Sequence, residues 1–246
     1  YTAASETING SDEIDLIDGS GGNDKINGKG GEDTLVIFSN KDDFEMVTLA
    51  GVTKIYGLNY VAGLGSDYWL DTIRMQNVEN IAFADQTIDV NTTTLSGVYY
   101  FGTLGNSYNI TLTDADDVID SAGGTESING GGGNDTLLLF ADKADFEIVT
   151  LAGVTKIYGL DSTGLASAYW LDTIRMINVE TIMFADQTDP VETSGIGGSY
   201  YYGTLGNSYN IILTDADDVI DSAGGTEVIN GGGGNDTLLL FADKAD

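Results

Sequence analysis

The sequence of this chain contains a repeat within a repeat. Residues 116–158 return almost unchanged, as far as the chain runs, at a shift of 101 residues, and a more diverged copy begins near Tyr1. The run TDADDVIDSAGGTE, for example, starts at Thr113 and again at Thr214. Self-similarity at a fixed period is the signature of a repeat architecture, in which each repeat packs on its neighbours. The chain therefore holds about two and a half repeats, and we expect it to be part of a longer array of such repeats.

A shorter period of nine residues runs inside each repeat. Residues 1–36 form four rows, YTAASETIN, GSDEIDLID, GSGGNDKIN and GKGGEDTLV, and the eighth position of every row is aliphatic. One aliphatic residue between polar neighbours, after a glycine-rich turn, predicts a very short strand. Such strands are expected to stack into a solenoid, where the next row satisfies their backbone hydrogen bonds. The aliphatic positions are Ile8, Ile17, Ile26, Leu35, Ile110, Ile119, Ile128, Leu137, Ile211, Ile220, Ile229 and Leu238.

The rows resemble the RTX nonapeptide G-G-x-G-x-D-x-U-x, in which U is a large aliphatic residue. Residues 130–138 read GGGGNDTLL and match every fixed position, and residues 231–239 match identically. The other rows are degenerate, with substitutions at glycine positions by Ser20, Glu13, Ala115 and Ala216. The segment DTIRMQNVENIAFADQT from Asp71, repeated from Asp172, is similar to the stretch that commonly follows RTX rows. The resemblance implies a parallel β-roll in which each row forms half a turn.

The same resemblance implies calcium. Glycines allow positive φ angles and close approach of carbonyl oxygens, and Asp adds a hard anionic oxygen of the kind that Ca²⁺ prefers. In an RTX roll the loops of alternate rows stack and share an ion, which implies the ligand pairs Asp15 with Asp33, Glu6 with Asp24, Asp117 with Asp135, and Asp218 with Asp236. The loop glycines expected beside these carboxylates are Gly131, Gly133, Gly232 and Gly234.

Some positions weaken or crowd these expected sites. Tyr108 and Tyr209 occupy the row position of Glu6, so the sites opposite Glu126 and Glu227 lose a carboxylate. Further acids in the same loops add either ligands or only charge: Asp114, Asp116, Asp215 and Asp217. The alternative is a set of ordinary glycine and Asx turns whose solvated acids bind ions diffusely. We disfavour it because like charges stacked in successive rows are destabilising without a counter-ion.

Composition excludes several classes of function. The chain carries 39 acidic and 9 basic residues, a formal charge of -30, which favours an open chain unless cations neutralise it. Nucleic acid and anionic lipid are excluded as partners because the few Lys and Arg residues are scattered. There is no His and no Cys, which removes the common nucleophile pairs, thiolate sites and disulfides. No apolar run approaches the length of about 18 residues that a membrane span needs, so no membrane insertion is expected.

The segments between the row blocks predict β-hairpins. In DFEIVTLAGVTKIYGL from Asp145, apolar and polar residues alternate before a glycine turn and a second strand. Trp69 and Trp170 are expected to pack over the end of a solenoid, with a glycan-stacking platform as the alternative. The aromatic runs 99–101 and 200–202 indicate either packing between repeats or a contact surface for another copy or a glycan. Local ion pairs are expected for Arg74 with Asp71 and for Arg175 with Asp172.

Together these patterns predict an all-β protein: parallel β-roll row blocks alternating with short β-hairpin segments in a tandem repeat of about 101 residues. The first repeat is residues 1–90, with rows 1–36 and a β segment 37–90. The second is 91–191, with a linker 91–102, rows 103–138 and a β segment 139–191. The third, truncated repeat is 192–246, with a linker 192–203 and rows 204–239.

The expected function is that of a secreted, extracellular repeat protein with Ca²⁺ as its cofactor and no catalysis. The resemblance implies type I secretion and folding outside the cell, where calcium approaches millimolar. The expected role is structural or adhesive at the cell surface, through self-association into a layer, matrix or fibre, with a cell-surface glycan as a further partner. The alternative is a non-catalytic calcium-binding module of a secreted RTX enzyme, such as a polysaccharide-active or other hydrolase. A third interpretation, a glycosidase with paired carboxylates, is disfavoured because no acid pair stands apart from the rows.

Overall fold

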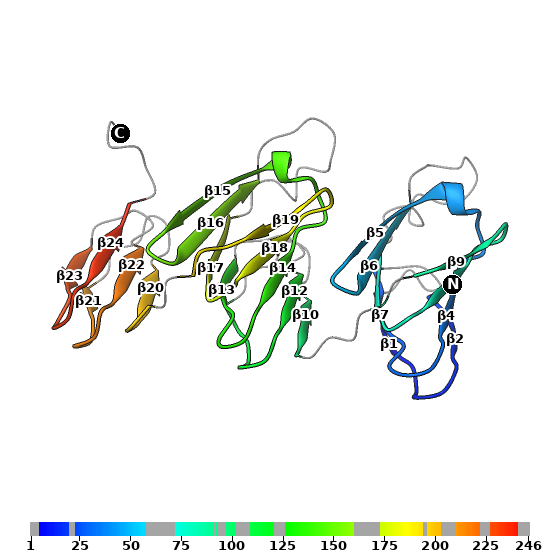
Figure 1. The fold of residues 1–246 in the computed structure, drawn as a ribbon, viewed down its shortest axis with the longest axis horizontal. Helices are drawn as coiled ribbons and strands as arrows, with labels where there is room; N and C mark the ends of the chain where they lie inside the picture. Colours follow the sequence, from blue (N-terminus) through cyan, green and yellow to red (C-terminus); the bar gives the residue numbers. More distant parts are fainter. Residues whose placement is uncertain are drawn as a thin grey trace. The chain divides into compact units, whose positions relative to one another are not determined.

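The computed structural model describes residues 5–19, 23–57, 72–90, 92, 97–101, 109–120, 126–159, 173–193, 196–202, 210–221 and 227–240 (Figure 1). The chain divides into two compact units. The first comprises Tyr1–Ser96, Leu138–Asp142 and Met183–Gln187, and the second comprises Gly97–Leu137, Lys143–Ile182 and Thr188–Asp246. Within the described ranges the structure is made of strands, and its helical turns are two 3-10 segments, η1 (Lys41–Asp43) and η2 (Lys143–Asp145).

The rows of the first repeat form very short parallel strands. They are β1 (Thr7–Asn9), β2 (Leu16–Asp18), β3 (Lys25–Asn27) and β4 (Thr34–Val36). Strand β1 pairs with β3 and β2 pairs with β4, with the aliphatic positions in register: Ile8 opposite Ile26, and Ile17 opposite Leu35. Alternate rows therefore stack in two sheets that share an apolar interior, which confirms the predicted parallel β-roll.

The later row blocks have the same strands. In the second repeat they are β11 (Asn109–Thr111), β12 (Val118–Asp120), β13 (Glu126–Asn129) and β14 (Thr136–Leu138). In the third they are β21 (Asn210–Ile212), β22 (Val219–Asp221), β23 (Val228–Asn230) and β24 (Thr237–Leu239). An aromatic strand precedes each of these blocks, β10 (Tyr99–Phe101) beside β12 and β20 (Tyr200–Tyr202) beside β22, both parallel.

The predicted hairpin follows each complete row block. Strands β5 (Phe44–Leu49) and β6 (Val52–Gly57) are antiparallel, joined by a two-residue turn in which Ala50 and Gly51 have φ angles of 45° and 75°. Positive φ at both central residues is the geometry of the tight hairpin turn that matches strand twist. Strand β6 pairs antiparallel with β7 (Thr72–Gln76), which returns parallel onto β3. The first sheet therefore has the order β1-β3-β7-β6-β5.

The opposite sheet is closed by two more short strands. Strand β8 (Asn80–Ala82) adds to β4 in parallel, and β9 (Thr87–Asp89) adds to β8 antiparallel, giving the order β2-β4-β8-β9. The second repeat follows the same plan with β15 (Phe146–Leu151), β16 (Val154–Gly159), β17 (Thr173–Ile177), β18 (Thr181–Met183) and β19 (Thr188–Pro190). Its sheets have the orders β11-β13-β17-β16-β15 and β10-β12-β14-β18-β19.

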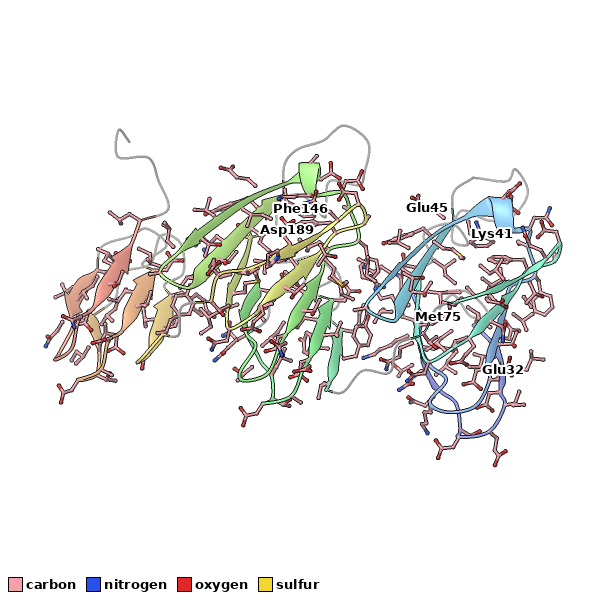
Figure 2. All side chains as sticks on the ribbon, in the orientation of Figure 1. Glu32, Lys41, Glu45, Met75, Phe146 and Asp189 are labelled. Atoms are coloured by element: carbon pink, nitrogen blue, oxygen red, sulfur yellow. The ribbon has the colours of Figure 1, made fainter. Side chains whose placement is uncertain are left out.

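The core lies between the two sheets of each roll. In the first repeat the buried cluster joins row residues to residues of the hairpin and the closing strands, with Met75 on β7 inside the fold (Figure 2). Its buried members are Ile17, Ile26, Leu35, Ile37, Ile55, Met75, Val78, Ile81 and Phe83. The hairpin and closing strands thus complete an interior that three-residue strands begin.

The third row block is less buried at the same positions. Ile128 and Leu137 of the second repeat are 1% and 0% exposed, whereas Ile229 and Leu238 of the third are 36% and 49% exposed. The difference arises because, in the second repeat, a further strand pairs with each of these row strands. Strand β17 pairs with β13 and β18 lies next to β14, while in the described residues no strand adds to β23 or β24 on that side.

Candidate calcium sites in the row blocks

Glycine turns bring the backbone of alternate rows into close contact. Gly131 and Gly133 have φ angles of 93° and 102°, in the region that favours glycine. A Cβ atom on them would lie 2.1 Å from the carbonyl oxygen of Thr113 and 2.6 Å from that of Ala115. In the third repeat Gly232 and Gly234, with φ angles of 83° and 86°, approach the equivalent carbonyls. These loops therefore place backbone oxygens next to one another without intervening side chains.

The predicted carboxylate pairs are brought together by one recurring hydrogen bond. In each pair the backbone N–H of the earlier acidic residue donates to the Oδ1 atom of the Asp that lies 18 residues later. The distances are 2.9 Å for Glu6 with Asp24, 2.8 Å for Asp15 with Asp33, 2.9 Å for Asp117 with Asp135 and 3.2 Å for Asp218 with Asp236. The stacking is the one predicted, and the contact joins a backbone donor to a carboxylate.

In the second and third repeats, the first carboxylate of each pair accepts several hydrogen bonds. Asp117 accepts hydrogen bonds from Val98 N at 2.5 Å and from both the backbone N and the hydroxyl of Thr113, each at 2.8 Å. Burial raises the pKa of Asp117, but these hydrogen bonds outweigh burial and its pKa falls below the usual value. The pKa of Asp218 is also lowered. The largest cause is the hydrogen bond from the backbone N–H of Ser199, and the backbone N–H and hydroxyl of Thr214 add to it.

The second carboxylate of the complete rolls has the opposite environment. Asp33 and Asp135 are both fully buried, and the Oδ2 atom of each has no hydrogen-bond partner. Burial, joined by the nearby charges of Glu180, Asp117 and Asp116, raises the pKa of Asp135 to about 6 despite the hydrogen bond from Asp117. Burial likewise raises the pKa of Asp33. An anionic oxygen held away from water without a donor is a costly arrangement that a cation relieves.

The donor set fits Ca²⁺. It consists of carboxylate and backbone carbonyl oxygens, the hard ligands that Ca²⁺ takes in groups of six to eight. Within the described ranges no group of three or more acidic side chains is arranged so that these side chains alone could hold a metal ion. The residues that would hold ions are thus the stacked carboxylates together with the carbonyl oxygens of the glycine loops.

Two acidic residues outside the rows take part in the same stack, although they were not among the predicted ligands. Glu79 accepts a hydrogen bond from Asp33 N through Oε2 at 2.8 Å, and Glu180 accepts one from Asp135 N at 2.8 Å. Each therefore stands where the Asp of another row would stand. The signal was present in the sequence as the N-V-E triplet at 77–79 and at 178–180, read only as part of the flanking stretch.

Other predicted residues have definite places or fall outside the described residues. Arg175 Nε lies 3.1 Å from Oδ2 of Asp221 in the third repeat, while Asp172, its predicted local partner, lies outside the described residues. Asp116 accepts a hydrogen bond from Asn134 N at 2.9 Å, and Asp217 accepts one from Asn235 N at 2.7 Å, so these acids also brace their loops. The residues outside the described ranges are Trp69, Asp71, Tyr108, Trp170, Asp172 and Tyr209.

The geometry defines a class of protein: a parallel β-roll whose glycine loops stack carboxylates and carbonyls as cation ligands. A family model for the RTX calcium-binding nonapeptide repeat, with four copies, matches residues 2–35, 109–137 and 210–238. These ranges lie within the three row blocks, so the rows are RTX calcium-binding nonapeptide repeats. RTX repeats are typical of secreted proteins.

Other comparisons add little to this assignment. No curated protein matches the chain as a relative. The extracellular lipase LipA from Serratia marcescens is similar in structure at 11% sequence identity and a TM-score of 0.21, over 72% of this chain and 37% of the lipase. The chain thus spans well under half of the lipase, and a likeness at this score carries no argument about activity. Among the described residues, no helix has the length and apolar character to cross a membrane.

Proposed function

We propose that this protein is an extracellular structural or adhesive array, stabilised by calcium, that builds a cell-surface layer, matrix or fibre by self-association. It has no catalytic activity of its own. The carrying observation is the way in which one repeat seats on the next within the second compact unit. There the hairpin of the second repeat contacts the row block of the third through a buried, mixed apolar and ionic surface.

The ionic part of this junction is a carboxylate between two cations. Asp221 Oδ2 lies 2.7 Å from Lys156 Nζ and 3.1 Å from Arg175 Nε, and all three side chains are largely buried. Burial lowers the pKa of Lys156, and its hydrogen bond to Asp221 opposes that shift. Removing one partner of a buried ion pair typically costs about 3 to 5 kcal/mol because it leaves a charge uncompensated. Such a contact favours association between repeats that carry opposite charges at these positions.

The apolar part surrounds the ion cluster. Val154 and Ile177 of the second repeat form one buried cluster with Val219 and Leu239 of the third, with Tyr200 packed against it. The side chain of Tyr202 stacks on Tyr200 at a centroid distance of 6.0 Å, and its hydroxyl hydrogen-bonds Oδ1 of Asn109. The aromatic strand β20 thus serves packing between repeats, one of the two roles predicted for it.

The same row face is at the surface in the first repeat. Leu16, at the position of Val219, is 77% exposed, whereas Val219 is 6% exposed. Phe38, in the same repeat, is 66% exposed. Both are large apolar side chains left at the surface of the first repeat, and exposed apolar surface is typical of interaction sites. They support association of the first repeat with another copy of the chain.

The chemistry of the chain supports a cycle in which calcium acts as the folding switch. At low calcium the formal charge of -30 keeps the chain open and suited to passage through a type I secretion channel. Extracellular modules typically bind Ca²⁺ with dissociation constants of about 10⁻⁴ to 10⁻³ M, so folding would follow export. A cell-surface glycan is a further proposed partner, while nucleic acid and membrane insertion are not expected.

Sedimentation velocity with and without 2 mM calcium, followed by electron microscopy, tests this function. We expect calcium to produce particles that grow with protein concentration. The double variant Leu16→Ser/Phe38→Ser should fold normally by circular dichroism yet grow less, while Leu151→Ser, which alters an exposed hairpin residue, serves as the control. A protein that folds with calcium but stays monomeric at every concentration would overturn the proposal.

A further inference from the structure

The end of each complete roll holds a group of oxygens that joins the last nonapeptide row to residues outside the motif. In the second repeat it consists of Asp135 in the last row and Asn178 and Glu180 in the turn from β17 to β18 (Figure 1). In the first repeat the same positions are Asp33, Asn77 and Glu79. We propose that this group, called here the cap site, binds one further Ca²⁺ ion in each complete repeat.

The first observation is a cradle over the first glycine of the last row. A Cβ atom on Gly130 would lie 1.8 Å from the carbonyl oxygen of Asn178 and 2.3 Å from Oδ2 of Asp135. On Gly28 it would lie 1.9 Å from the carbonyl oxygen of Asn77 and 2.3 Å from Oδ2 of Asp33. In both repeats the two oxygens therefore face one point that only glycine leaves open.

The spacing of these oxygens suits one Ca²⁺ ion. Ligand oxygens at about 2.3 to 2.6 Å from the same ion are themselves separated by about 3 to 5 Å. The Asn178 and Asp135 oxygens cannot be further apart than the sum of their distances to the Gly130 point, which does not exceed the upper end of that range. A single cation bridging both oxygens is therefore sterically reasonable.

The second, independent observation is that one of the two oxygens lacks a donor. Oδ2 of Asp135 and Oδ2 of Asp33 are buried and accept no hydrogen bond, although both side chains are 0% exposed. Their Oδ1 atoms, in contrast, accept from the backbone of Asp117 and Asp15. The oxygen without a donor is the one that faces the cap site, as a cation ligand would.

The turn that supplies the carbonyl is fixed in place. Asn178 has a φ angle of 51°, and its side-chain amide donates to Oδ1 of Asn129 at 3.0 Å. Asn77 has a φ angle of 52° and donates to Asn27 at 2.9 Å. Asn adopts this left-handed conformation more readily than most residues. The side-chain contact holds the carbonyl toward the glycine.

Glu180 supplies the second negative charge. Its Oε2 accepts from Asp135 N at 2.8 Å and its Oε1 accepts from the hydroxyl of Thr193 at 3.3 Å. Glu79 has the same two partners, Asp33 N at 2.8 Å and Thr92 at 3.3 Å. Because no glycine loop follows this turn, the cap site would end the series of ions with a side chain where a row would continue it.

The test is the number of calcium ions bound at saturation, measured by equilibrium dialysis on the whole chain with the fold checked by circular dichroism. The double variant Glu79→Gln/Glu180→Gln keeps an oxygen for each hydrogen bond and removes the charge. We expect the affinity of two ions, one per complete repeat, to fall about 10-fold or more, in line with other changes around metal ligands. The remaining ions should be unaffected.

Glu45→Gln/Glu147→Gln is the matched control, because both residues are exposed on the hairpins and the charge change is the same. A second variant, Gly28→Ala/Gly130→Ala, fills the cradle directly and should lose the same two ions. The proposal is overturned if the Glu79/Glu180 variant binds calcium like the parent, or if the control lowers calcium binding equally. The outcome does not depend on whether copies associate, so it fails or stands apart from the proposed function.

Discussion

At the scale of the residue, the row Asp has two separable roles. One carboxylate oxygen accepts a backbone N–H from the row 18 residues earlier, which sets the stacking. In Asp33 and Asp135 the other oxygen has no donor and stays buried. The first role needs only a hydrogen-bond acceptor, whereas the second needs negative charge and a cation.

Replacing Asp135 by Asn separates these roles. The amide oxygen still accepts from Asp117 N, but the anionic ligand is lost, so the calcium concentration at half-folding should rise by about tenfold, equivalent to about 1.4 kcal/mol. Circular dichroism during a calcium titration measures it. Asp42→Asn, the same charge change on an exposed residue of η1, should leave the midpoint in place. An unchanged midpoint for Asp135→Asn would contradict the assignment of Asp135 as a ligand.

The loop glycines differ in how much they tolerate a side chain. Gly133 has a φ angle of 102° and a Cβ there would lie 2.6 Å from Ala115 O, so Gly133→Ala should destabilise the calcium-loaded protein by about 1 to 3 kcal/mol. At the adjacent Gly132 the nearest atom is the mobile Asp114 carboxylate at 3.3 Å, and Gly132→Ala should cost less than about 1 kcal/mol. Urea unfolding in calcium distinguishes them, and equal losses would be inconsistent with this loop geometry.

The raised pKa of Asp135 predicts how pH affects the calcium-free protein. The pKa of Asp135 is about 6 in the folded chain, compared with 3.8 for an Asp in the unfolded chain. The stability that protonated Asp135 contributes is therefore complete below about pH 3.8 and is lost as pH rises through about 6. Acidifying metal-free protein from pH 7.5 to 4.5 should therefore increase its β signal in circular dichroism. The variant Asp33→Asn/Asp135→Asn should show a smaller change, and a β signal that falls on acidification would refute this coupling.

At the scale of the element, the strand that follows the hairpin pairs with a row strand and shields the row block. Ile128 lies opposite Met176 in the pairing of β13 with β17 and is 1% exposed, while Ile229, at the same row position in the third repeat, is 36% exposed. Three-residue strands bury little by themselves, so much of the apolar stabilisation of a row depends on the strand that pairs with its open side.

The substitutions Ile128→Ala and Ile229→Ala test this dependence with one chemical change at matched positions. The buried Ile128 should cost about 2 to 5 kcal/mol, and the partly exposed Ile229 should cost less than half as much. Hydrogen exchange of each row block in calcium reports the two losses separately. Equal destabilisation of both blocks would mean that pairing with β17 does not protect the rows.

The elements also show how far sequence reasoning reaches. The nine-residue period predicted the row strands and their pairing, because Ile17 and Leu35 recur at a fixed spacing. The alternation around Phe146 predicted the hairpin. The return of β7 onto β3 was not predicted, since pairing of Ile26 with Met75 joins distant segments and no local pattern encodes it. For the same reason Glu79 and Glu180 were not recognised as members of the carboxylate stack.

At the scale of the whole molecule, charge decides between an open and a folded chain. The acidic residues outnumber the basic ones by 39 to 9, and in the second compact unit Lys156 and Arg175 are engaged with Asp221. Few internal cations are left to offset the stacked rows. Neutralisation must therefore come from solution, either as a diffuse ionic atmosphere or as ions at defined sites.

These two modes of neutralisation give different responses to salt. Diffuse screening depends on ionic strength, so 150 mM NaCl would fold the chain as well as calcium does. Ions at sites built from carboxylates and carbonyls depend on ligand geometry, and Mg²⁺, which keeps its waters and demands an octahedron, should substitute poorly for Ca²⁺. We therefore expect 2 mM CaCl₂ to produce the β spectrum, and neither 150 mM NaCl nor 2 mM MgCl₂ to do so. A metal-free protein that is already fully folded in NaCl would show that the stacked carboxylates need no bound ion.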